Sequence, residues 1–322
     1  MSRRPVRHVP KDSSRRRTWV YLAVGAFILF DVVLIAFALG SADADPGVTP
    51  GVVPTPSSSV TSTPSPSPVA NAEPAANTIV AMPVTRLISA VDGTTAWRAA
   101  TGACPAAVAS PEVTTDSGAT WTTTDATTPT DVTSVQSLSA QSATVLELVG
   151  LDLADCAPDF VKTFVGGDNF RAYPDRIDAQ WFVDPADRAV VHSPEGDQPA
   201  PCDSVLTLAP RSGTEAAVLC DANELYVTTD AAATWSPAVI VTGAVNVASS
   251  DAGYVAAIAG SADCVGVQVV TLSPELEATV TGCLPVTGDL AGNVALSASG
   301  DTLWLWAGDI VARSTTAGAA WL

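Results

Sequence analysis

Short apolar runs alternate with polar turn residues along most of the chain, from residue 79 to residue 322. The runs are rich in Val, Ala, Thr and Leu, and they are separated by Gly, Asp, Ser and Pro. No stretch of this region combines a sustained helical period with capping residues, whereas turn pairs such as Asp-Gly and Ser-Gly recur. The pattern predicts one all-β domain over residues 79–322, which is long enough to bury a sizeable core.

A single long apolar run precedes this domain, at residues 18–39, and Asp31 is its only charged residue. A helix of 22 residues is long enough to cross a hydrocarbon core of about 30 Å. A cleaved signal peptide is the alternative, because Ala42-Asp43-Ala44 has the small-x-small form of a cleavage site. The run exceeds the roughly 7–15 apolar residues of a signal peptide, and this length favours a retained transmembrane helix.

Asp31 lies near the middle of the predicted span. A charged aspartate costs about 2.5–3.5 kcal/mol there on insertion scales, which the surrounding apolar residues can offset. One interpretation is a protonated side chain that is hydrogen-bonded to its own helix. The other is a polar contact with a partner helix or a second copy of this one, which makes Asp31 a candidate contact with a transmembrane partner.

Basic residues are concentrated before the apolar run, since seven of the 15 lie within residues 1–17. The positive-inside rule makes residues 1–17 a cytoplasmic tail and places the β domain outside, anchored by a single pass in the plasma membrane. Residues 41–322 carry 31 acidic and 8 basic residues, a net charge of −23. A domain this acidic repels phosphate backbones, so we expect no nucleic-acid partner.

The segment between the span and the domain, residues 40–78, is dominated by Pro, Ser, Thr, Val and Ala and contains no aromatic residue. No apolar periodicity offsets the entropy cost of ordering its backbone, which predicts a disordered linker. Proline at this density favours extended polyproline II conformation, so the linker is expected to act as a semi-rigid stalk.

An eight-residue pattern occurs in full once and in altered form twice more. The complete copy is TTDSGATW at residues 114–121, in which Thr114, Asp116, Gly118 and Trp121 are the defining positions. Asp116 can accept hydrogen bonds from its own turn, Gly118 can adopt positive φ, and Trp121 can pack beneath the hairpin. The altered copies lack the glycine or the aspartate, and they retain Thr228, Asp230 and Trp235 in one case and Ser314, Gly318 and Trp321 in the other. Each copy predicts a tight β-hairpin.

The spacing of these copies predicts a repeat architecture. They begin 114 and 86 residues apart, and both spacings divide into units of about 40 residues, the length of one four-stranded propeller blade. Weaker candidates for the intermediate hairpins occur at 163–170, 191–196 and 271–276. We therefore predict a β-propeller of about six four-stranded blades, within a range of five to seven. We also expect residues 78–83 to add the strand that closes the last blade.

The complete motif and its altered copies resemble the Asp-box, or bacterial neuraminidase repeat, of the β-propellers in the sialidase and sortilin superfamily. The resemblance covers residues 80–322, and it implies a membrane-anchored bacterial member of that group. In the family the Asp-box lies on the outer hairpin of a blade, away from any active site. The resemblance therefore implies a fold and gives the motif a structural role.

Six cysteines follow the apolar run, an even number that is typical of disulfides in an exported domain. Fifteen connectivities are possible for six cysteines. Their positions within the repeats favour two short local loops, Cys202–Cys220 and Cys264–Cys283, and one link between neighbouring blades, Cys104–Cys156. Because there is no Cys-x-x-Cys and only one histidine follows the run, His192, we expect no metal site.

The sequence offers no catalytic set. The resemblance would imply an arginine triad and a Phe/Tyr-Arg-Ile-Pro motif before the first Asp-box, but only Arg86 and Arg98 precede residue 114 in the domain and neither lies in such a motif. His192 falls in a predicted hairpin tip, where a surface imidazole is the ordinary interpretation. No phosphate-binding glycine loop or EF-hand spacing is present, so we expect no cofactor.

Trp304 and Trp306 alternate on one predicted strand and therefore share a face. Large aromatic residues are usually buried, which favours packing between blades. If this face were exposed, the pair would be a platform for a sugar or a peptide.

Two functions remain open at this point. The first is a non-enzymatic binding or interaction module for a protein or a cell-wall glycan. The second is a diverged, sialidase-like glycoside hydrolase without the usual arginine triad. A hydrolase needs carboxylates, or a tyrosine and a carboxylate, converging at the mouth of the channel with raised pKa values.

Overall fold

The computed structural model describes residues 79–322. The basic tail 1–17, the predicted span 18–39 with Asp31, and the linker 40–78 lie outside these residues. Within the described part, no helix has the length and apolarity that a membrane crossing requires.

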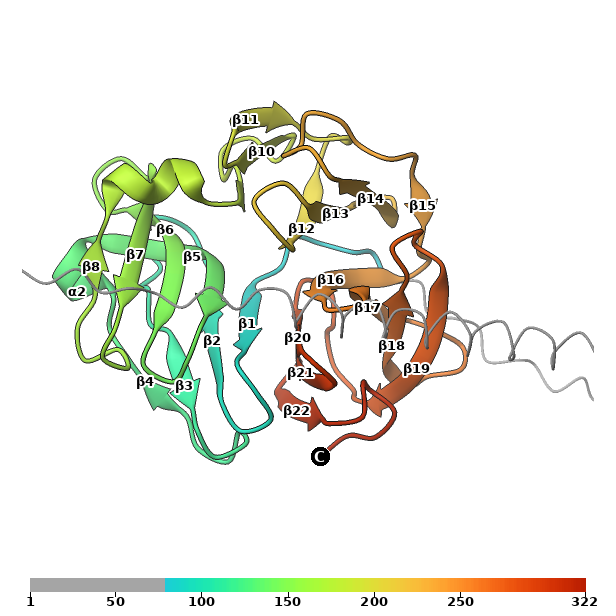
Figure 1. Cartoon of the computed structure of the whole chain (residues 1–322). Coiled ribbons are helices and arrows are strands. Elements are labelled where there is room, and N and C mark those ends of the chain that lie inside the picture. The colour runs from blue at the N-terminus through green and yellow to red at the C-terminus, as the bar shows by residue number, and fades with distance from the viewer. Residues whose placement is uncertain (1–78) are drawn as a thin grey trace, which may run out of the picture. The chain divides into compact units, whose positions relative to one another are not determined.

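The described residues form six antiparallel sheets arranged in a ring (Figure 1). Four sheets have four strands and two have three, and in each sheet the strands pair in chain order. Such sheets, repeated around a centre, are the blades of a β-propeller. The predicted all-β propeller of about six blades is therefore confirmed.

The first three blades follow one another along the chain. Blade 1 contains β1 (Arg86–Ala90), β2 (Ala96–Ala100), β3 (Glu112–Thr114) and β4 (Thr122–Thr123), and the short helix α2 (Thr127–Thr130) follows it. Blade 2 contains β5 (Val132–Ala140), β6 (Leu146–Asp152), β7 (Pro158–Thr163) and β8 (Arg171–Ala172), and the 3-10 helix η1 (Pro174–Ala179) follows it. Blade 3 contains β9 (Phe182–Val183), β10 (Val190–Ser193) and β11 (Gly196–Pro199).

The other three blades complete the ring. Blade 4 contains β12 (Val205–Pro210), β13 (Ala216–Cys220), β14 (Glu224–Thr228) and β15 (Val239–Ile240). Blade 5 contains β16 (Ala244–Ser250), β17 (Gly253–Ala259), β18 (Gly266–Leu272) and β19 (Ala278–Pro285). Blade 6 contains β20 (Val294–Ser299), β21 (Thr302–Ala307) and β22 (Ile310–Ser314).

The hydrophobic core is divided among the junctions between blades, and each of the six junctions has a cluster of its own. In ring order from the junction of blades 1 and 2, the clusters include Val132, Phe160, Trp181, Leu225, Leu284 and Trp304. The β strands are short and rich in Val, Ala and Leu because both faces of a middle strand pack against neighbouring blades. The whole of β13, for example, is buried. No blade could bury its faces alone.

Blade 6 meets blade 1 without sharing a strand, which corrects one expectation. Residues 79–84 form no strand, and blade 6 remains three-stranded. The ring is instead closed by contacts between β20, β21 and β1, helped by the hydrogen bond from the Thr85 amide to the Gly292 carbonyl (2.8 Å). Residues 79–84 contribute side chains rather than a strand, since Ala81 is buried against the cluster between blades 5 and 6.

Tryptophan and arginine side chains make this closing junction specific. The Trp304 Nε1–H donates to the Asp92 carbonyl in the β1–β2 turn (2.8 Å), and Arg313 donates to the next carbonyl, that of Gly93 (2.6 Å). The Arg98 guanidinium lies over the rings of Trp121 (4.2 Å) and Trp306 (4.8 Å). Cation–π contacts of this kind add attraction that depends on geometry to the burial of the indole rings.

All six cysteines form disulfides in the predicted pairs: Cys104–Cys156, Cys202–Cys220 and Cys264–Cys283. The first joins the β2–β3 loop of blade 1 to the β6–β7 loop of blade 2. The second closes a loop with a sequence separation of 18, which the chain-entropy model values at about 3 kcal/mol.

Replacing Trp304 tests whether the closing junction limits stability. The indole is fully buried, so Trp304→Ala should lower the free energy of unfolding by about 3–5 kcal/mol, as core Trp→Ala substitutions do. Denaturant titration followed by circular dichroism measures this loss. Ile310→Ala, at an exposed position of the same blade, is the matched control and should change stability by less than about 0.5 kcal/mol. Equal effects of the two substitutions would show that the junction does not limit stability.

Candidate functional site

The innermost strands of the six blades enclose a cavity of about 920 Å³. Residues of β1, β5, β9, β12, β16 and β20 line it, together with loops at one end. A volume of this size falls within the range of about 300–1,000 Å³ that small-ligand sites occupy. The centre of the ring is therefore a candidate ligand site.

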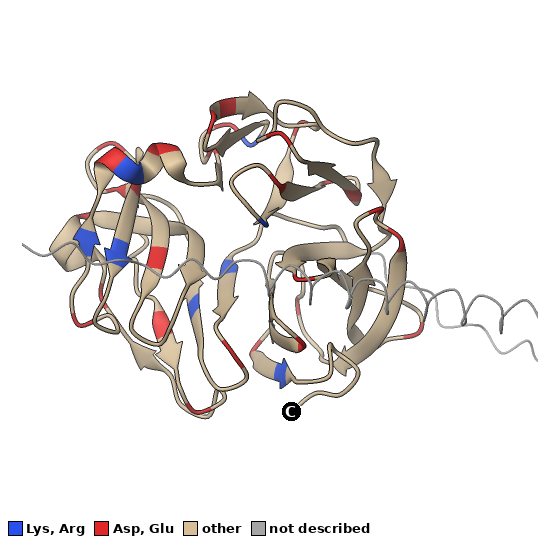
Figure 2. Ribbon diagram, viewed as in Figure 1, with Lys and Arg blue, Asp and Glu red and all other residues tan. Residues whose placement is uncertain are grey.

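The cavity wall is almost free of charge. Among the lining residues of the described part, Arg188 alone has a side chain that carries a formal charge at neutral pH. Most others are aliphatic, small or hydroxyl-bearing. Acidic residues, by contrast, are spread over the turns and outer strands around the ring (Figure 2).

Serine side chains in the wall tie neighbouring inner strands together. The Ser89 hydroxyl accepts a hydrogen bond from the Ala140 amide across blades 1 and 2 (2.9 Å). The Ser297 hydroxyl accepts one from the Ala90 amide across blades 6 and 1 (2.9 Å). An inner strand lies at the edge of its sheet and leaves backbone groups unpaired on the cavity side, so these hydroxyls satisfy part of that edge.

Arg188 lies in the turn between β9 and β10 and reaches across to blade 4. Its Nε donates to the Val205 carbonyl (2.7 Å) and its Nη2 donates to the Leu206 carbonyl (3.1 Å), both in the first residues of β12. No carboxylate of the described residues lies within 4.0 Å of the guanidinium nitrogens. Burial lowers the Arg188 pKa from its usual value. No local sequence pattern marks this arginine, because it follows two turn aspartates that look like ordinary surface residues.

Two polar residues of the cavity wall sit at β-bulges. Thr207 follows a register shift in β12, and Asn246 follows one in β16. A bulge re-aims the side chain beside it. Asn246 is buried and donates to the Val294 carbonyl of blade 6 (3.0 Å). The Thr207 hydroxyl is buried and has no hydrogen-bond partner among the described residues.

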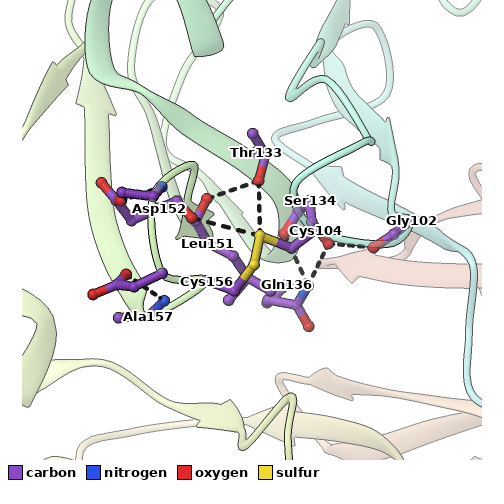
Figure 3. The surroundings of a disulfide bond; sticks show 11 residues. Gly102, Cys104, Thr133, Ser134, Gln136, Leu151, Asp152, Cys156 and Ala157 are labelled. Atoms are coloured by element: carbon purple, nitrogen blue, oxygen red, sulfur yellow. Dashed lines mark hydrogen bonds between the residues drawn. A yellow bond between two sulfur atoms is a disulfide. The ribbon is translucent and has the colours of Figure 1, made fainter.

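The Cys104–Cys156 disulfide also lines the cavity. Figure 3 shows it beside the beginning of β5, where the Thr133 hydroxyl donates to the Leu151 carbonyl (2.9 Å). The Gln136 amide nitrogen donates to the Ser134 carbonyl close by (2.8 Å). The disulfide thus holds the β2–β3 loop of blade 1 and the β6–β7 loop of blade 2 at the end of the cavity where β5 begins.

The repeated hairpin turns lie elsewhere, at the end of a third strand in their blades, and none of their residues lines the cavity. In the complete copy, the Thr114 hydroxyl donates to Asp116 (2.8 Å) and accepts from the Gly118 amide (3.0 Å). Asp116 also accepts from the amide (2.9 Å) and the hydroxyl (2.6 Å) of Thr120. Gly118 has φ +88°, and a Cβ added there would lie 3.2 Å from the Trp304 ring, so a side chain would meet both backbone strain and crowding.

The altered copies build the same turn with different residues. The Thr228 hydroxyl donates to Asp230 (2.8 Å), although two alanines replace the Ser-Gly pair and take positive φ themselves. In the last copy, the Ser314 hydroxyl accepts from the Gly318 amide (2.9 Å), and the Thr316 hydroxyl takes over the aspartate's role by accepting from the Ala320 amide (2.9 Å). Trp235 and Trp321 are partly buried against the clusters of their junctions.

A further copy, weakly indicated by the sequence at residues 163–170, adopts this turn in blade 2. The Thr163 hydroxyl accepts from the Gly167 amide (3.1 Å), and Val165 stands where the complete copy has aspartate. The turn therefore depends on a hydroxyl at its first position more than on the carboxylate.

The aspartates of these turns are held ionised. Hydrogen bonds from the hydroxyl and the amide of Thr120, and then from Thr114, lower the Asp116 pKa to about 2. Thr234 and Thr228 lower the Asp230 pKa in the same way. A carboxylate whose charge is stabilised by hydrogen bonds from its own turn is a structural clasp.

Trp304 is 0 % exposed, as the favoured packing between blades requires, so the alternative of a ligand platform does not apply to it. Trp306 is partly buried, with the guanidinium groups of Arg86 (4.7 Å) and Arg98 (4.8 Å) over its ring. Both indoles belong to the closing junction and leave no paired face for a ligand.

Apart from Arg188, the titratable side chains of the described part do not line the cavity. His192 is on β10 rather than in a hairpin tip, stacks on Phe182 (4.4 Å between ring centroids), and its Nδ1 lies 2.6 Å from Asp197. Burial, and secondarily the charge of Asp152, raises the Asp159 pKa, but neither aspartate lines the cavity. Within residues 79–322, no three His, Cys, Asp or Glu side chains are grouped as a metal site would require.

No protein-family model matches the chain, and no curated protein matches it. Solved structures of β-propeller proteins resemble it at low similarity. One is described as YCF48 bound to D1 peptide, with 16% identity over 75% of this chain and 82% of that one, and a TM-score of 0.29. Another is the GH74 xyloglucanase of Xanthomonas campestris, with 16% identity over 77% of this chain and 38% of that one, and a TM-score of 0.29. A third is Trypanosoma rangeli sialidase, with 10% identity over 74% of this chain and 46% of that one, and a TM-score of 0.27.

Asp116→Ala tests the structural role of the turn carboxylate and its dependence on pH. The folded-state pKa of about 2 lies below the ordinary value of 3.8, so the carboxylate adds stability above about pH 4 and loses it as the pH falls toward 2. The variant should melt a few degrees below the parent at pH 6, and the gap should narrow at pH 3. Asp301→Ala, an exposed turn aspartate of blade 6, is the control and should show no such gap. A difference in melting temperature between parent and variant that does not change with pH would refute the role of Asp116 as a clasp.

Proposed function

We propose that the chain is a membrane-anchored extracellular binding module, in which a six-bladed propeller presents its central cavity to a protein or cell-wall glycan. The observation that carries this proposal is the cavity itself. It has the volume of a ligand site, and the inner strands of all six blades wall it with neutral side chains. Polar groups at one end, around Arg188, give it a means of orienting a ligand.

We also propose that the hairpin turns are Asp-box repeats. In each turn a backbone amide donates to the hydroxyl of the first residue, and this shared bond and the place of the turns after a third strand support a structural role on the blades. In this view the turns stabilise the ring, and the ligand contacts come from the inner strands and their loops.

The anchor completes the proposed arrangement. Residues 18–39 span the plasma membrane, residues 1–17 remain in the cytoplasm, and residues 40–78 act as the stalk that holds the propeller outside the cell. The charge asymmetry and the length of the apolar run support this topology.

Chemical crosslinking of the full chain in native membranes, followed by affinity purification, tests the binding role. The proposal expects a specific protein or glycan to be captured through residues of the inner strands. Incubation of the same purified chain with fluorogenic glycosides tests the diverged-hydrolase alternative. Release of the fluorophore, lost on replacing Asp159 and Asp152 together or another carboxylate pair, would replace the binding proposal by the enzymatic one.

Asp31 is proposed as a contact with a transmembrane partner, either another protein or a second copy. Asp31→Leu should abolish co-purification of that partner from detergent extracts, because an apolar helix offers no polar group for the contact. Val33→Leu, which alters the same span without removing a polar group, is the matched control. The same set of proteins co-purifying with parent and Asp31→Leu would rule out this role.

A further inference from the structure

The Arg188 guanidinium is the one charged group in the lining of the cavity among residues 79–322, and its hydrogen bonds leave part of it free. Nε and Nη2 each donate to a carbonyl of β12, while Nη1 donates to no group of the described residues. Arginine presents five N–H donors in a planar fork. Two of them fix the fork against the beginning of β12, so the remaining donors are pre-oriented.

The acids nearest in sequence do not neutralise this charge. Asp184 and Asp187 lie in the same turn, and each accepts hydrogen bonds from backbone amides of that turn, at 2.7–3.2 Å. Neither forms a salt bridge with Arg188. A partly desolvated arginine without a carboxylate partner is stabilised when a ligand anion binds to it, because charge-assisted hydrogen bonds are roughly twice as strong as neutral ones.

The surroundings limit the kind of anion. Residues 41–322 carry a net charge of −23, so a polyanion such as nucleic acid or a polyacidic glycan is repelled before it reaches the cavity. A single carboxylate on an otherwise neutral segment avoids most of that repulsion. The ligand group that fits is therefore a lone carboxylate.

The wall favours a peptide over a sugar as the carrier of this carboxylate. The two large aromatic residues that line the cavity, Trp181 and Phe182, are buried and present no open ring face for a sugar. The inner strands instead present sheet edges, whose unpaired backbone groups an extended peptide can join. Small and aliphatic side chains line the rest of the space.

We propose that the cavity binds an extended, largely neutral peptide segment whose single carboxylate pairs with the free donors of Arg188. This inference rests on the proposed binding function and specifies its ligand. The carboxylate belongs either to the end of a peptide chain or to an Asp or Glu side chain, and the experiment separates these two sources.

The full chain is incubated with three pools of random pentapeptides, and retained peptides are identified by mass spectrometry. The first pool has free C-terminal carboxylates and no acidic side chain. The second is amidated and has one internal Asp or Glu, and the third is amidated without any acid. We expect the first or the second pool to be retained at least tenfold above the third. Equal retention of all three pools, or retention of none, would overturn the inference.

Two substitutions connect this preference to Arg188. Arg188→Gln should reduce the retention of acidic peptides at least tenfold, whereas Arg171→Gln, at an exposed position on β8, should leave it unchanged. Because Arg188→Gln also removes the anchor of β12, a second variant keeps the arginine. Ala186→Glu places a carboxylate at an exposed position of the cavity lining, two residues from Arg188, and it should reduce the retention of acidic peptides without affecting folding.

Retention of acidic peptides that neither substitution changes would place the peptide site elsewhere. Acidic oligosaccharides serve as a parallel probe, and their retention in place of peptides would overturn the peptide assignment while leaving the binding module intact. If crosslinking in membranes captures a ligand but no carboxylate pool is retained, this inference fails and the proposed function stands.

Discussion

A blade of this propeller can bury its faces only against another blade, so the whole ring depends on the junction where the last blade meets the first. No strand is shared there, and side chains must supply the connection. Trp304 of blade 6 fills the space and donates its indole N–H to the turn between β1 and β2. Arg98 of blade 1 then lies over rings from both blades, Trp121 and Trp306. A closed ring leaves none of the six junction clusters open to water. The contact between blades 6 and 1 closes the ring, so the burial of the other five clusters depends on it.

The same device recurs at two further junctions. The Trp97 indole of blade 1 donates to the Ser142 carbonyl (3.0 Å), and the Trp181 indole of blade 3 donates to the Ser212 carbonyl (2.9 Å). In each case the acceptor lies in the turn between the first two strands of the next blade. An indole buries a large apolar surface and needs one partner for its N–H. A neighbouring turn meets both requirements and fixes the angle between the blades.

The sequence predicted the fold because its signals are local. Short strands, turn residues and the spacing of the Thr114, Thr228 and Ser314 hairpins were enough to predict a ring of about six blades, and the cysteines pair as their positions in the repeats favoured. The closing contact could not be predicted, because it joins residues more than 200 positions apart and follows from packing rather than from a motif. The sequence pattern also overstated the importance of Asp116 to the turn, since Val165 and Thr316 occupy its place in other copies. It also missed Arg188, whose surroundings come from two different blades.

The position of Arg188 depends on the least developed blade. Blade 3 has only three strands, its innermost strand β9 is two residues long, and the cluster between blades 2 and 3 has only three buried members. Blade 3 is instead fixed to blade 4, by the Trp181 contact with Ser212 and by the Cys202–Cys220 bond, which ties the connecting loop to β13. The Arg188 bonds to β12 lie on this same side. The arginine is therefore held by blade 4, which keeps its free donors fixed in the cavity wall even where the neighbouring junction is thin.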